Sequence, residues 1–125
     1  MSTKISGVEL EIMEYLWKRG EACTFAQLLE YFNTVKQKQW CRQTLNTCLL
    51  RLKKKGLLLQ EKNGTKSFYI PAVTRVRYHQ ICAEEILREA YGGTLSNFVA
   101  ALTGKDQITE LEKDELLEYI RKVKE

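Results

Sequence analysis

The sequence predicts a mainly α-helical chain of the α+β class, in which three helices and a β-hairpin (residues 1–73) precede three more helices (residues 74–125). Three observations lead to this prediction. Apolar residues recur at intervals of three and four along most of the chain. Two extended runs flank Asn63-Gly64, a strong signal for a hairpin. Residues 31–83 hold 11 basic residues and 1 acidic residue, whereas residues 1–30 carry a net charge of −2 and residues 84–125 a net charge of −4. The basic middle therefore suggests one surface for a polyanion, and the acidic end suggests a different role.

A capping box is expected to begin the first helix at Ser6, whose hydroxyl can accept a hydrogen bond from the amide of Glu9. The Glu9 carboxylate can accept a bond from the Ser6 amide in return. Gly20 ends the helix, since glycine adopts the left-handed conformation without strain. The apolar positions that face the core along this helix are Leu10, Ile12, Met13, Leu16 and Trp17.

A second capping box, Thr24 with Gln27, begins the next helix, and the polar run 33–39 ends it. The third helix is expected over about residues 41–55, with cations and Gly56 at its C-terminal end. The apolar residues that pack these two helices into the core are Phe25, Leu28, Leu29, Phe32, Leu45, Cys48, Leu49 and Leu52.

The third helix has the composition of a surface that contacts DNA. Residues 31–60 contain seven basic residues and no acidic one, and a helix that lies against phosphate must lack carboxylates because phosphate repels them. Amides, hydroxyls and arginine distinguish base edges, and apolar groups can contact the thymine methyl. An ordinary solvated helix face is the alternative. On a helical wheel, the residues on and beside the face opposite the buried side are Gln43, Thr44, Asn46, Thr47, Leu50, Arg51 and Lys54.

The hairpin adds a fourth element to the three helices. Asn63-Gly64 is expected to form its turn, because both turn residues must tolerate positive φ. Three helices followed by a hairpin is the order of a winged helix-turn-helix. Its tip would offer polar and basic side chains to a phosphate backbone or a minor groove, namely Lys62, Asn63, Thr65 and Lys66.

The three C-terminal helices carry more apolar surface than so short a segment can enclose alone. Gly92-Gly93 ends the first of them, and a capping box of Thr109 with Glu112 begins the third. A second copy of the chain could cover the apolar side chains, and a twofold dimer would read an inverted repeat in successive major grooves. The residues expected at the dimer interface are Tyr78, Ile81, Leu95, Phe98, Val99, Leu102, Leu116, Leu117 and Ile120.

Other function classes find little support in the sequence. The chain has a single histidine, His79, and its acidic and cysteine residues do not cluster at ligand spacing, so no catalytic site is expected. No cofactor or metal is expected either: Cys82 lies three residues from His79, but two candidate ligands do not make a metal site. The four cysteines lack metal-ligand spacing and are expected to be buried or half-buried free thiols. The apolar stretch 8–17 contains three glutamates, so neither a signal peptide nor a membrane span is expected, and the expected location is the cytosol. A winged-helix module that binds an acidic protein partner is the competing function.

Four segments spread over nearly the whole chain carry a family pattern: residues 6–17 (SGVELEIMEYLW), 40–56 (WCRQTLNTCLLRLKKKG), 67–71 (SFYIP) and 91–101 (YGGTLSNFVAA). They resemble the penicillinase-repressor family, the BlaI/MecI/CopY group of bacterial winged-helix repressors. The resemblance implies a homodimer that binds inverted repeats with TACA/TGTA-like half-sites near promoters of resistance, metal-handling or cell-wall genes. In the β-lactam branch, it also implies a membrane-bound sensor peptidase and proteolysis of the repressor.

The resemblance also assigns positions within the third helix. Those that match the family's groove-facing helix are Thr44, Thr47 and Arg51, and neighbouring positions are filled by Arg42, Gln43 and Asn46. Relatives often have Ser-Pro-Lys where this chain has Cys-Arg-Gln (41–43), and Asn46 replaces a frequent lysine, so a different base preference is expected. The Asn-Phe bond cleaved in the β-lactam branch aligns with Ala101-Leu102, and the clustered C-terminal cysteines of the copper-sensing branch are missing. We therefore do not assign the cleavage site of the β-lactam branch to this chain, although a membrane sensor or protease pathway stays implied by the resemblance, and no copper site is expected.

Overall fold

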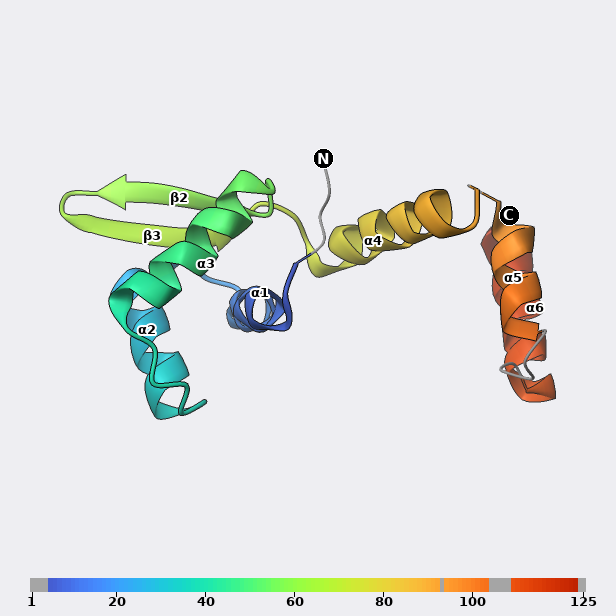
Figure 1. The fold of residues 1–125 in the computed structure, drawn as a ribbon, viewed down its shortest axis with the longest axis horizontal. Helices are drawn as coiled ribbons and strands as arrows, with labels where there is room; N and C mark the ends of the chain where they lie inside the picture. The colour runs from blue at the N-terminus through green and yellow to red at the C-terminus, as the bar shows by residue number, and fades with distance from the viewer. Residues whose placement is uncertain (1–4, 93, 104–108, 124–125) are drawn as a thin grey trace. The chain divides into compact units, whose positions relative to one another are not determined.

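The computed structural model of the chain describes residues 5–92, 94–103 and 109–123, with the side chains of 102, 103 and 123 excepted (Figure 1). The chain divides into two compact units, Met1–Cys82 and Ala83–Glu125. The elements of the first unit are α1 (Gly7–Arg19), β1 (Cys23–Thr24), α2 (Phe25–Thr34), α3 (Arg42–Lys54), β2 (Leu58–Asn63), β3 (Lys66–Pro71) and the first half of α4 (Arg75–Ala90). The second unit holds the rest of α4, α5 (Leu95–Thr103) and α6 (Glu110–Val123). No helix in the described ranges is both long and apolar enough to cross a membrane.

The start of α1 differs in one respect from the predicted capping box. Ser6 Oγ accepts a hydrogen bond from the Glu9 amide at 3.1 Å, as predicted. The Glu9 carboxylate, however, is buried, and its Oε2 accepts a hydrogen bond from Lys55 Nζ at 2.9 Å. Glu9 therefore joins α1 to the end of α3 and does not complete the box. Gly20 ends α1 with φ of 73°, as its left-handed conformation requires.

The segment between α2 and α3 is held by one side chain. Asn33 Nδ2 donates to the Trp40 carbonyl at 2.9 Å, and the Trp40 amide donates to Asn33 Oδ1 at 2.6 Å. The Trp40 ring also stacks on Phe32, with centroids 4.8 Å apart. These contacts fix the residue that lies two positions before α3. At the start of α2, the predicted box of Thr24 with Gln27 is fully formed.

The strands form a three-stranded antiparallel sheet in the order β1-β3-β2. The two-residue strand β1 pairs Cys23 with Tyr69 and was not predicted, because two residues are too few to show a strand period. The hairpin is confirmed, but its turn lies one residue later than expected. Asn63 pairs with Lys66, so the loop residues are Gly64 and Thr65, and Gly64 supplies the positive φ of 68°. We call the hairpin of β2 and β3 the wing.

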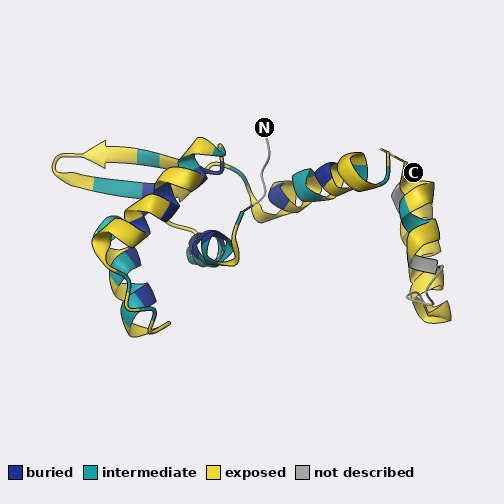
Figure 2. Ribbon diagram, in the orientation of Figure 1, coloured by how far each residue is buried: buried dark blue, intermediate teal, exposed yellow. Residues whose placement is uncertain are grey.

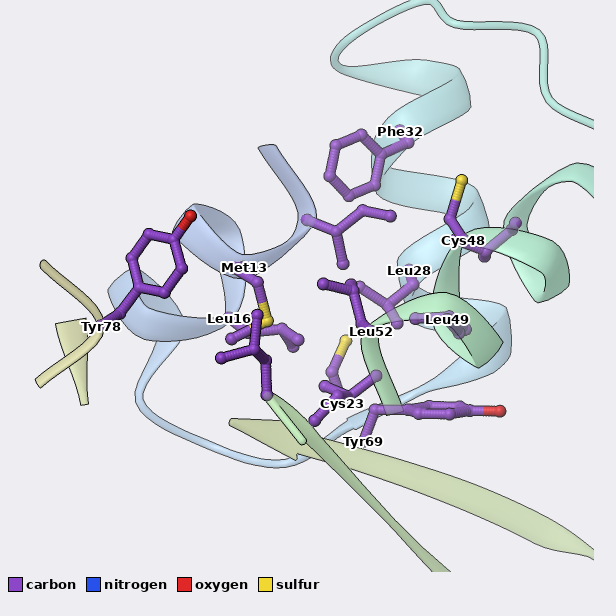
Figure 3. Close-up of a cluster of buried hydrophobic side chains, with 14 residues drawn as sticks. Met13, Leu16, Cys23, Leu28, Phe32, Cys48, Leu49, Leu52, Tyr69 and Tyr78 are labelled. Carbon is purple, nitrogen blue, oxygen red and sulfur yellow. The ribbon is translucent and has the colours of Figure 1, made fainter. Parts of the chain in front are cut away.

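The core of the first unit lies between α1, α2, α3 and the sheet (Figure 3). Its buried apolar residues include the predicted inward positions Ile12, Met13, Leu16, Leu28, Phe32, Leu45, Cys48, Leu49 and Leu52. Cys23 of β1, Leu57 just before β2, and Leu58 and Tyr69 of the wing add to it. The other predicted inward positions, Leu10, Trp17, Phe25 and Leu29, are partly buried against this core.

The beginning of α4 packs on the first unit. Tyr78 is buried, and its ring lies 5.5 Å from that of Trp17 between centroids. Trp17 Nε1 donates to the Val73 carbonyl at 2.9 Å, and Arg75 pairs with Glu14 at 2.8 Å. The first unit thus extends to Cys82, beyond residue 73, where the sequence suggested a boundary.

In the second unit, helix ends are well defined but little is buried. The ring of Tyr91 meets Phe98 edge to face at 5.1 Å, and the predicted box of Thr109 with Glu112 is formed. Every described side chain from Glu110 to Lys122 is exposed (Figure 2). The apolar residues among them are Leu111, Leu116, Leu117, Tyr119 and Ile120.

Candidate nucleic-acid interface

The outer face of α3 is an exposed polar surface. The predicted DNA-contacting residues on this helix are all exposed: Arg42, Gln43, Thr44, Asn46, Thr47, Arg51 and Lys54. Leu50, between them, is 53% exposed. The cations at the C-terminal end of α3 differ in whether they bind other side chains of the protein. Lys55 pairs with Glu9 and Lys53 binds Gln60, whereas Arg51 and Lys54 form no ion pair with a described residue.

The wing presents a second group of basic side chains. Lys62 and Lys66 lie next to its turn, and both are exposed, as are Asn63 and Thr65. In the antiparallel register, Lys62 faces Ser67 and Lys66 faces Asn63, so the two lysines are one residue pair apart. Both cations therefore lie at the end of the wing, on opposite sides of the hairpin.

A cleft of about 680 Å³ lies between the wing and the first turns of α2 and α3. Its lining includes five of the nine residues predicted to bind DNA, which are Arg42, Gln43, Asn46, Lys62 and Lys66. The other four, Thr44, Thr47, Arg51 and Lys54, lie on α3 outside the cleft lining. The structure thus arranges the predicted residues as one helix face and one basic cleft beside it, a form that can hold a polyanionic strand.

The family model of the penicillinase repressor matches residues 5–122. The chain belongs to the penicillinase repressor family. The penicillinase repressor of Bacillus licheniformis is 32% identical over 121 residues, which cover 97% of this chain and 92% of that protein. The methicillin resistance regulatory protein MecI of Staphylococcus aureus is 24% identical over 119 residues, or 95% of this chain and 94% of that protein.

A solved structure supports the same family for the first unit. The solution structure of the DNA-binding domain of the repressor BlaI is 33% identical, covers 58% of this chain and 84% of that domain, and gives a TM-score of 0.51. The predicted winged-helix fold is thereby confirmed. Penicillinase repressors are DNA-binding transcriptional repressors and not enzymes, so family membership also confirms the predicted function class and decides against a module for acidic protein partners.

Some cleft residues of this penicillinase-repressor chain escaped the sequence analysis. Phe25, the first residue of α2, lies under the Arg42 guanidinium, 4.8 Å from its carbon to the ring centroid. Gln60 and Ser67 hydrogen-bond to each other across the wing at 2.9 Å. The sequence carries no local signal for these contacts, because each joins residues at least seven positions apart on different elements.

The cysteines differ from the expectation at one position. All four are free, and Cys23 and Cys48 are buried, which raises their thiol pKa values through loss of hydration. Cys41 is exposed at the N-cap of α3, so it was wrong to expect only buried or half-buried thiols. Its Sγ lies 3.2 Å from Thr44 Oγ1, and this hydrogen bond lowers the Cys41 pKa. Among the described residues, no three His, Cys, Asp or Glu side chains come together in a way that could hold a metal ion.

Proposed function

We propose that this chain represses transcription as a homodimer bound to an inverted-repeat operator that overlaps a promoter. Each protomer would insert α3 into a major groove, and its wing would contact the adjacent backbone. The observation that carries the proposal is the exposed face of α3, free of carboxylates, beside a cleft that holds Arg42, Lys62 and Lys66. Repression would be steric, because the bound dimer occupies the site that the polymerase needs.

The side chains of the interface divide by chemistry into two groups. Gln43 and Asn46 suit adenine, since a carboxamide can both donate to and accept from its major-groove edge, and Arg51 suits guanine. The residues suited to phosphate are the cations at the rim of this surface, namely Arg42, Lys54, Lys62 and Lys66. Specificity is assigned to the first group, and salt-dependent affinity to the second.

Thr47 is assigned an apolar contact. Its hydroxyl donates to the Gln43 carbonyl at 2.9 Å within α3, so its proton is not free for a base. The exposed methyl group remains available for the C5 methyl of thymine. The hydroxyl oxygen can still accept a bond, but it has no donor role in this arrangement.

The proposed dimer interface is formed by the C-terminal helices. Leu116, Leu117 and Ile120 are 39%, 45% and 38% exposed in the single chain, and they fall on one side of α6. Phe98 and Val99 are half-buried, and Ile81 also, whereas Leu95 is exposed. Tyr78 is already covered by Trp17 in its own chain, and the side chain of Leu102 lies outside the described residues. A second copy would remove the apolar surface of α6 from water.

The names of the relatives suggest which genes are regulated. They are a penicillinase repressor and a methicillin resistance regulator, so we propose antibiotic-resistance genes as targets, with metal-handling and cell-wall genes as further candidates. A membrane sensor or a protease pathway would supply the inducing signal. The protein would act in the cytoplasm, where bacterial promoters are located.

The proposal is tested by binding of the purified full chain to duplexes from promoters near its own gene. We expect binding at physiological salt to be at least about a thousandfold tighter than to a scrambled duplex of equal length. Fluorescence anisotropy at fixed salt gives both constants. Equal affinity for the two duplexes would contradict an operator-binding function.

A further inference from the structure

A chain of three side chains connects α3 to both strands of the wing. Lys53 Nζ donates to Gln60 Oε1 at 2.6 Å, and Gln60 Nε2 donates to Ser67 Oγ at 2.9 Å. Lys53 belongs to α3, Gln60 to β2 and Ser67 to β3. All three side chains are partly buried, so solvent competes little with these bonds.

This relay lies directly beside the lysines of the wing. Gln60 and Lys62 are two residues apart on β2 and therefore point to the same side of the hairpin. Ser67 faces Lys62 in the register and shares that side, whereas Lys66 pairs with Asn63 and points to the other side of the hairpin. Gln60 and Ser67 line the same cleft as Lys62 and Lys66. Any rotation of the wing about its base would have to stretch the relay before it could move the two lysines.

The wing needs such a connection because little else holds its outer part. Its base is fixed by Leu58 and Tyr69, which are buried in the core. Beyond that pair, the residues from Glu61 to Lys66 are all exposed, and the tip extends beyond the helices (Figure 1). A two-stranded hairpin without packing is only marginally rigid.

The relay also explains why the clustered lysines of α3 do not share one role. The ammonium group of Lys53 is directed to an amide of the wing, whereas the next residue, Lys54, is exposed and forms no ion pair in the described chain. A cation that binds phosphate would have no reason to be partly buried against Gln60. Lys53 is therefore assigned to the contact between α3 and the wing, and Lys54 to the DNA-contacting surface.

We propose that Gln60 is a positioning residue for DNA binding: through Lys53 and Ser67 it sets the distance between α3 and the wing, so that Arg42 and Lys62 contact one DNA strand together. This inference rests on the proposed function. It predicts that Gln60 contributes to affinity without touching DNA. Its contribution depends on Lys62, which shares its side of the hairpin.

The test is a double-mutant cycle in the full-length chain with Gln60→Met, which keeps the length of the side chain and removes both hydrogen bonds. We expect promoter-duplex affinity to fall about tenfold, the loss expected when interactions with charged groups are weakened. The slope of log affinity against log salt should fall by about 0.9 for each phosphate that the variant no longer neutralises. Lys62→Ala should weaken binding in the unmodified chain and have little further effect in Gln60→Met.

Two controls separate positioning from a general loss of stability. Lys54→Ala should lower promoter-duplex affinity by the same factor in the unmodified chain and in Gln60→Met, because Lys54 lies on α3 outside the relay. Lys53→Met should reproduce the effect of Gln60→Met, and the double variant should be no weaker than either. Circular dichroism and thermal unfolding would establish that each variant is folded. If Gln60→Met does not fold, the same cycle is measured with Lys53→Met.

Full additivity of Lys62→Ala and Gln60→Met would overturn the positioning role, as would a further loss of salt slope when Lys53→Met is added to Gln60→Met. The second result would mean that Lys53 contacts phosphate itself. In both cases the unmodified chain still prefers the promoter duplex, so the proposed function stands. An unmodified chain without that preference would overturn both.

Discussion

The two units of this chain differ in where their apolar residues are covered. In the first unit, side chains such as Ile12, Leu28 and Leu52 are completely buried within one copy. In the second, Leu111 is 70% exposed and Leu117 45% exposed. The first unit therefore carries its stability in its own core, whereas the second leaves apolar side chains of α6 exposed in the described residues. In the proposed dimer, the first unit would be complete within one copy, and the second would be completed by its partner.

Charge divides the chain in a similar way. The stretch 31–83 has a net charge of +10, and the stretch 84–125 has a net charge of −4. The positive part would be attracted to DNA, and the negative part would be repelled by it. In the proposed complex, this difference would favour contact of α3 and the wing with the duplex over contact of the C-terminal helices.

The largest effect on the difference between the two units is expected from Leu117→Asp, which places a charge on the apolar side of α6. We expect monomers in light scattering and a loss of operator affinity of at least about a hundredfold, because two linked half-site contacts become one. Unfolding of the first unit should be unchanged. Leu111→Asp is the matched control, since Leu111 lies on the opposite side of the helix; a dimer disrupted equally by both would refute this interface.

A second change addresses the interior of the first unit alone. Lys55→Met leaves Glu9 buried without a cation, which should lower the free energy of unfolding by about 3 kcal/mol. Lys38→Met removes a comparable contact, that of Lys38 with Glu11 at 2.9 Å, but at the surface, where about 0.5 kcal/mol is expected. Urea unfolding measures both free energies. Equal losses in the two variants would show that burial of Glu9 does not depend on the charge of Lys55. Dimerisation should not change in either variant.

A third pair of variants sharpens the assignment of the α3 face. Arg51→Ala should lower promoter binding by about 2 kcal/mol and affect random duplex less, since Arg51 is assigned to a base edge. Lys54→Ala should weaken both duplexes alike and reduce the salt slope by about 0.9. Anisotropy titrations at several salt concentrations separate these outcomes. The reverse pattern would exchange the two roles.

The smallest expected effect concerns Thr47. Thr47→Val keeps the exposed methyl group and should change specific binding by less than about 0.5 kcal/mol, because the hydroxyl is already bonded to Gln43. Thr47→Ser removes the methyl group and should cost about 0.8 kcal/mol, the value of one buried methylene. Competition titrations with the promoter duplex would measure the difference. A larger loss for valine than for serine would assign the hydroxyl a direct role.

Local signals predicted much of the fold. The caps at Ser6, Thr24 and Thr109, the apolar stripe of α3 and the hairpin are all visible in short stretches of sequence, and the structure contains each of them. The outward side of α3 followed from the same stripe, since a helix that buries Leu45 and Leu52 on one side must expose the residues on its opposite side.

Contacts between distant residues could not be predicted in this way. Glu9 was assigned to a cap because the motif is local, but its carboxylate binds Lys55, 46 positions away. Arg42 over Phe25 and Lys53 beside Gln60 likewise depend on how the elements pack. The turn of the wing was misplaced by one residue because the pairing of Asn63 with Lys66 is a property of the strand register, and the Asn-Gly pair does not determine it.

The two hydrogen bonds between Asn33 and Trp40 have a consequence for how this protein can evolve. They fix both ends of the connecting segment, so the tryptophan that precedes α3 is anchored independently of residues 35–39. We expect insertions or deletions within that segment to leave the start of α3 in place relative to α2. Descendants of this repressor could thus vary the connector in length while they preserve the position of the proposed DNA-contacting helix.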